Sequence, residues 1–128
     1  MIPRSRIARL ALVIAGFLFL VIGLVVLLDP RLIEGLGLRL DSPLAVSEVR
    51  ATYGGMHVLV GVLLIVGAFA VRIRDAALLI LATYTLGIVA GRIVGFATDG
   101  WPGPIVVLFL VPEALAAGVA TTLLLFRR

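Results

Sequence analysis

The sequence predicts an all-α integral membrane protein, a four-helix bundle with both termini in the cytoplasm. Hydrophobic residues make up 62% of the 128 residues, and the mean hydropathy is +1.27. A soluble domain is typically only about half apolar. Four long apolar runs follow one another, and an apolar run of about 20 residues can cross a bilayer as a helix. A chain of this length forms a single domain, residues 1–128.

The predicted transmembrane helices span residues 10–28, 51–71, 76–97 and 105–126. Each run is continuous rather than alternating, which favours helices over the strands of a barrel. The first run follows a basic flank and is longer than the apolar core of a typical signal peptide. No small-x-small cleavage site follows it, and it ends at Asp29-Pro30. We therefore expect an uncleaved first helix.

The three connections between these helices differ in length and composition. Residues 29–50 form a long, partly apolar segment, which fits either a short interfacial helix or an ordinary loop. Asp41-Ser42-Pro43 and Ser47 are suitable for turns or N-caps before the second helix. The second connection is a tight basic turn at residues 72–75. The third, residues 98–104, is rich in glycine and proline, and its Trp101 is suited to the membrane interface.

Arginine distribution predicts the orientation, because cytoplasmic loops of membrane proteins carry an excess of basic residues. One side holds Arg4, Arg6, Arg9, Arg72, Arg74, Arg127 and Arg128. The opposite side holds Arg31 and Arg39, offset by Asp29, Glu34, Asp41, Glu48 and Asp99. Both termini are therefore expected in the cytoplasm of a bacterial cell, with the first and third connections outside the inner membrane.

Composition also excludes several function classes. The chain has no cysteine and one histidine, so thiol chemistry and multi-histidine metal sites within one chain are excluded. The net charge of +4 comes from arginines spread between the apolar runs, so nucleic-acid binding is not expected. No lysine is present for a Schiff base, and the serines lie outside the apolar runs. We expect no enzymatic activity, no cofactor and no metal.

The candidate binding residues are ionisable and aromatic side chains in or beside the apolar runs. A charge in the bilayer core costs at least about 2.5 kcal/mol, so such residues mark functional sites by default. Counting at 1.5 Å per residue places His57, Arg92 and Glu113 roughly 10, 8 and 12 Å below the outer ends of their helices. The predicted ligand-binding residues are Arg50, Tyr53, His57, Arg92 and Glu113, with Glu48 and Asp99 at the rim.

Three interpretations of this set stay open. Arg92 and Glu113 could be a structural ion pair between the third and fourth helices. Arg92 and Arg50 could instead hold a polar or anionic headgroup, or His57 and Glu113 could handle protons. His57 and Tyr53 also fit ordinary packing with satisfied polar groups. On the third helix, Gly87, Gly91 and Gly95 form a small-xxx-small ridge, which predicts close packing between helices.

The polar signature resembles a known family. The stretch Ser47–His57, SEVRATYGGMH, followed by Gly91-Arg92, Asp99-Gly100 and Glu113, resembles small four-helix bacterial membrane proteins grouped as domain-of-unknown-function family number 4345. The resemblance covers nearly the whole chain and implies the four-helix architecture. That family has no established activity, so the resemblance implies no mechanism.

We expect a non-enzymatic membrane module that binds a lipid-like or otherwise amphipathic ligand, or a partner protein, at an outer-leaflet polar pocket. The alternatives are a dimeric proton-coupled transporter and an accessory subunit of a larger membrane complex. The expected partners are the lipid bilayer, a lipid-like ligand, and a second copy of the chain or another membrane protein.

Overall fold

The computed structural model describes residues 4–126 and confirms the all-α class: within that range the regular elements are helices. Four helical stretches are long and apolar enough to cross a membrane, Arg4–Leu28, Pro43–Phe69, Val71–Thr98 and Pro104–Leu125. Their large apolar side chains mostly face outward, as expected for surfaces in contact with lipid. Arg127 and Arg128, two of the arginines used to predict orientation, lie outside the described residues.

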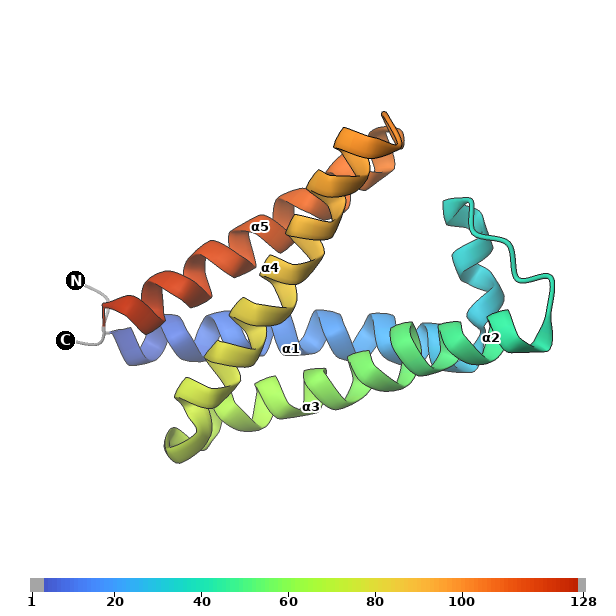
Figure 1. Cartoon of the computed structure of the whole chain (residues 1–128). Coiled ribbons are helices and arrows are strands. Elements are labelled where there is room, and N and C mark those ends of the chain that lie inside the picture. Colours follow the sequence, from blue (N-terminus) through green and yellow to red (C-terminus); the bar gives the residue numbers. More distant parts are fainter. Residues whose placement is uncertain (1–3, 127–128) are drawn as a thin grey trace.

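Helix α1 (Arg4–Leu28) and helix α3 (Met56–Phe69) lie side by side, and α4 (Arg74–Thr98) and α5 (Pro104–Leu125) form the second pair (Figure 1). The two pairs meet near the chain termini and diverge toward the other end of the molecule (Figure 1). We call these ends the terminal end and the distal end. The main core lies toward the terminal end, where small and large apolar residues from all four spans interlock, among them Leu12, Leu64, Leu78 and Ala120.

The second span begins earlier than the sequence predicted. Helix α2 (Pro43–Val49) continues through a π-helical stretch, η2 (Arg50–Gly55), into α3, so the helix starts at Pro43 rather than Ala51. Ser42 caps it by accepting a hydrogen bond from the Ala45 backbone N–H at 3.1 Å. Ser47, the other predicted cap, lies inside the helix. The prediction was wrong because hydropathy marks where lipid contact begins, whereas the cap decides where the helix begins.

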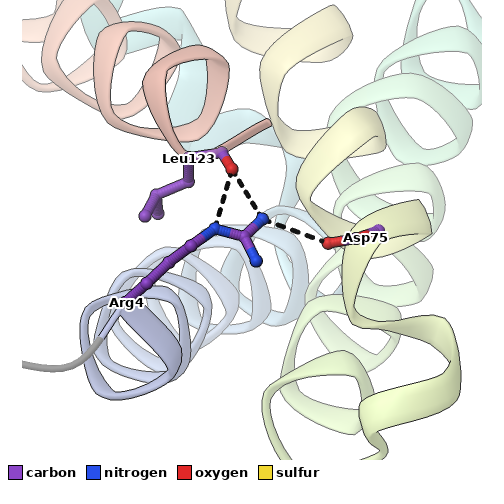
Figure 2. Close-up of polar contacts among 3 residues, drawn as sticks. All are labelled: Arg4, Asp75 and Leu123. Atoms are coloured by element: carbon purple, nitrogen blue, oxygen red, sulfur yellow. Dashed lines mark hydrogen bonds and ion pairs between the residues drawn. The ribbon is translucent and has the colours of Figure 1, made fainter. Parts of the chain in front are cut away.

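The first helix also extends beyond its predicted start, to Arg4, and its basic residues belong to the helix. Arg4 joins α1 to the other pair: its Nε and Nη2 donate to the Leu123 carbonyl oxygen of α5 at 3.0 and 2.6 Å. Its Nη2 also lies 3.5 Å from Asp75 Oδ1 of α4 (Figure 2). The carbonyls of the last turn of a helix have no partner within the helix, so this arginine supplies one.

The α1–α3 contact depends on glycine. Gly16 faces Gly61, and Gly23 faces Gly54 of η2, with the two glycines of each helical stretch seven residues apart. A Cβ at Gly61 would lie 2.8 Å from the Gly16 carbonyl oxygen, and one at Gly23 would lie 2.6 Å from the Val58 nitrogen. Only glycine allows the two backbones to approach this closely.

The predicted glycine ridge on α4 does not pack in this way. A Cβ at Gly87 or Gly91 would meet nothing within 4 Å among residues 4–126, and one at Gly95 would only touch the Asp99 side chain. The predicted close approach between helices at this ridge is therefore absent within the described chain. Instead, Gly87 and Gly91 of this ridge are exposed.

Candidate functional site

Arg92 and Glu113 form an ion pair between two transmembrane helices, α4 and α5. Arg92 Nε donates to Glu113 Oε2 at 2.6 Å, and Arg92 Nη2 donates to Oε1 at 2.7 Å, so the pair is bidentate. The two side chains are 26% and 19% exposed. The Arg92 guanidinium also lies 6.0 Å from the centroid of the Phe109 ring. This geometry matches the ion pair that the sequence offered as one interpretation.

Pairing leaves part of Arg92 available. A guanidinium carries five N–H donors, and Glu113 takes one from Nε and one from Nη2. The three remaining donors lie on the two terminal nitrogens. Because Glu113 fixes the plane of the guanidinium, these donors are held in place rather than free to rotate. Arg92 therefore keeps donors for a second acceptor while Glu113 holds it.

Arg92 also lines an open cavity of about 400 Å³ at the distal end of α4 and α5, which we call the Trp101 cavity. The Asp99 carboxylate, Phe96 and Trp101 form further walls. Trp101 is 70% exposed and its ring centroid lies 6.0 Å from that of Phe96. The cavity thus combines a cation, an anion and aromatic surface within one turn region, where Gly100 and Gly103 adopt positive φ.

His57 lies in a separate aromatic cluster formed by three spans. Its ring stacks on Phe19 of α1 at 5.1 Å between centroids, meets Tyr84 of α4 edge-on at 5.6 Å and stacks near Tyr53 at 6.0 Å. His57 Nδ1 is 3.1 Å from the Thr52 carbonyl oxygen. A carbonyl oxygen can only accept, so Nδ1 carries the proton in this contact, and Nε2 of the neutral ring is then an acceptor.

The π-helical stretch explains this histidine contact. In η2 the Met56 N–H bonds the Ala51 carbonyl, five residues back. The widened turn brings the Thr52 carbonyl oxygen within reach of the His57 side chain. Such π turns are rare and occur often at functional sites. The run of two glycines, Gly54 and Gly55, lies in this stretch, and Gly54 also contacts Leu27 of α1.

The structure brings together only part of the predicted set. Tyr53 and His57 lie together in the aromatic cluster, and Arg92 and Glu113 form the ion pair, so the set falls into two separate groups. Asp99 lines the Trp101 cavity with Arg92. Arg50 instead lines a different cavity beside the first connection. Glu48 is exposed on α2 and lines neither cavity.

Sequence reasoning missed the Phe19 contact, the π turn, the Arg4 contact with Leu123, and the burial of Arg74. Arg74 was assigned to a tight basic turn, and in the structure it is only 9% exposed and its Nη2 donates to the Ala68 carbonyl at the end of α3, at 2.9 Å. The paired glycines could have been found, because Gly16 and Gly23 have the same seven-residue spacing as Gly54 and Gly61.

No metal-ligand group is present within residues 4–126: no three histidine, aspartate or glutamate side chains come together.

The fold and the site define a small multi-pass membrane protein with an anchored arginine beside an open distal cavity. A family model matches residues 7–124, and the chain belongs to that family, described as Domain of unknown function (DUF4345). No curated protein and no solved structure matches the chain.

Proposed function

We propose that this protein is a non-enzymatic membrane module that binds an amphipathic ligand in the Trp101 cavity. The observation that carries the proposal is Arg92, which is held by Glu113 and also lines the open cavity. Glu113 already neutralises the charge of this arginine, so Arg92 is stable in the membrane without a ligand. It can nevertheless bind a ligand oxygen at little further cost in side-chain entropy.

The charges of the cavity indicate the kind of headgroup. Arg92 supplies donors, and the Asp99 carboxylate seven residues along the same chain supplies an acceptor, about 10 Å away along the helix axis. A polar head with both an acceptor and a cationic or donor group would satisfy both residues. Trp101 and Phe96 offer aromatic surface suited to the membrane interface. A zwitterionic, lipid-like ligand matches this combination.

The proposal includes an orientation. Arg6, Arg9 and Arg72 are exposed at the terminal end, which by the arginine bias belongs in the cytoplasm. The Trp101 cavity then opens at the outer face of a bacterial inner membrane.

Cysteine labelling tests this orientation. The chain has no cysteine, so a single-cysteine variant is labelled only at the introduced residue. A membrane-impermeant thiol reagent added to intact cells should label Arg39→Cys but not Arg72→Cys; the opposite pattern would overturn the orientation.

Native mass spectrometry of protein released gently from its own membranes tests ligand binding. We expect a discrete bound small molecule on the wild type, reduced in Asp99→Asn and in Trp101→Ala. Arg72→Gln, an exposed charge change at the other end, is the control and should keep the molecule. Protein that carries no small molecule, or carries it equally in all variants, would contradict the proposal.

A second candidate function, an accessory subunit or homo-oligomer, is favoured by the exposed glycine face of α4. Gly87 and Gly91 have no neighbour that a Cβ would meet within residues 4–126, and glycine faces of this spacing commonly receive another transmembrane helix. Cross-linking between single cysteines at Gly91, in membranes, would support this candidate. The proton-coupled transporter stays a prediction from the sequence, and no observation on this structure favours it.

A further inference from the structure

The first connection, residues 29–42, is an ordered structure at the distal end rather than a simple loop. It contains a short 3-10 helix, η1 (Pro30–Leu36), whose first turn is capped when Asp29 Oδ1 accepts from the Arg31 N–H at 3.1 Å. Glu34 Oε1 accepts from the Leu40 N–H at 3.3 Å and lies 3.4 Å from Arg31 Nη1. Gly37 ends η1 with φ of 90°, a conformation that favours glycine.

A small apolar core fastens this connection to the helices. Val26 of α1, Ile33 of η1, Leu40 and Val49 of α2 are all buried against one another. The core lies apart from the main one at the terminal end. Because of this core, the polar groups of the first connection are held in place by packing as well as by their own hydrogen bonds.

A cavity of about 400 Å³ lies against this connection, and we call it the Arg50 cavity. Its charged walls are Arg31, Asp41 and Arg50, and Ser42 and Ser47 add hydroxyl groups. The Arg50 guanidinium has no hydrogen bond or ion pair with any side chain or backbone group of residues 4–126. Arg31 uses one donor on Glu34 and keeps the rest.

Exposed leucines occur in the same two segments as the cavity residues. Leu32, Leu36 and Leu38 of the first connection and Leu44 of α2 are 57%, 47%, 45% and 70% exposed. Exposed leucines next to arginines are typical of segments that lie in the membrane interface, with apolar side chains in the acyl region and cations at the headgroups. Leucines inserted in the acyl region would hold the two cavity arginines beside them at the depth of lipid phosphates.

We propose that the Arg50 cavity binds the phosphate of an anionic lipid headgroup, with Arg31 and Arg50 as donors from two sides. Guanidinium groups match phosphate oxygens in bidentate geometry. Two arginines and one aspartate leave one net positive charge in the cavity walls. That balance suits a singly charged phosphate diester, as in a lipid, better than a doubly charged free phosphate ion.

This site is independent of the proposed ligand site. It shares no lining residue with the Trp101 cavity and includes neither Arg92 nor Glu113. Substitutions in one cavity should therefore leave binding at the other unchanged, and the failure of one proposal can be told from the failure of the other.

The test titrates delipidated protein in detergent with phosphatidylglycerol and follows lipid adducts by native mass spectrometry. Arg31→Gln and Arg50→Gln should each weaken adduct formation about fivefold, the typical effect of one basic residue near anionic lipid. Arg39→Gln is the matched control, because Arg39 is an exposed arginine of the same connection that does not line the cavity. It should change adduct formation less than twofold.

Equal weakening by all three substitutions, or by none, would overturn the proposal, since either result means that no particular arginine is involved. A second arm adds inorganic phosphate before the lipid. The proposal expects no competition at moderate phosphate concentration. Competition that disappears in Arg50→Gln would show that free phosphate occupies the cavity and would overturn the lipid assignment. Circular dichroism of each variant checks that the helices are retained.

Discussion

The two helix pairs are held together by different means. The α1–α3 pair relies on glycine at Gly16, Gly23, Gly54 and Gly61, where the backbones touch. The α4–α5 pair has an ion pair, Arg92 with Glu113, in addition to its share of the main core, and its own glycines have no close neighbour within residues 4–126. The first contact is apolar and intolerant of added volume. The second includes a polar pair whose arginine lines an open cavity, so the candidate site lies in the pair that close glycine packing does not constrain.

The largest expected effect is at the glycine contact. Gly61→Leu places a side chain where even a Cβ would lie 2.8 Å from backbone atoms of α1, so the helices must separate. We expect the free energy of unfolding to fall by about 3 kcal/mol or more. Reversible unfolding in mixed micelles measures it. A loss smaller than that of Glu113→Gln would show that glycine packing is not the main attachment of the first pair.

The ion pair should come next. Glu113→Gln leaves the Arg92 guanidinium without its charged partner inside a transmembrane helix, and breaking such a pair typically costs about 3 kcal/mol when it is fully buried. We expect somewhat less here, because both side chains are partly exposed. The reversed pair, Arg92→Glu with Glu113→Arg, should recover part of the stability. No recovery in the double variant would indicate that one of the residues acts through other contacts.

A smaller effect is expected at the terminal end. Arg4→Gln removes the bonds to the Leu123 carbonyl and the contact with Asp75 that join α1 to the second pair. The expected loss is about 1 kcal/mol, the usual contribution of a hydrogen bond. Arg6→Gln, an exposed neighbour in the same helix, is the control and should be neutral. Equal effects of the two substitutions would mean that only the general charge of the terminus matters.

The smallest effect on the isolated chain is expected for Gly91→Leu, the same substitution as at Gly61. Nothing within residues 4–126 lies within 4 Å of an added Cβ, so stability should change by no more than about 0.5 kcal/mol. Any association between copies through this face should be lost, which size-exclusion chromatography with light scattering would detect. A large loss of stability in a monomeric sample would contradict the packing described for α4.

The sequence predicted the four spans because lipid demands long apolar helices, and it offered the Arg92–Glu113 pair because two charges in lipid need partners. The sequence predicted close helix packing at the glycines of α4, which the structure does not show. Small-xxx-small spacing identifies a smooth helix face but does not identify the helix that packs on it. Arg50 was grouped with Arg92 because counting residues gives depth along a helix but not direction around it. The π turn, which reorients His57, leaves no reliable hydropathy signal.

The most direct test of the central claim is an experimental structure of the protein extracted with its own lipids, without added ligand. We predict density for a polar head between Arg92 and Asp99 in the Trp101 cavity, with an apolar tail along α4 and α5, and the Arg92–Glu113 pair intact. A cavity closed by Trp101, or filled by a helix of another chain, would contradict ligand binding and favour the accessory-subunit function.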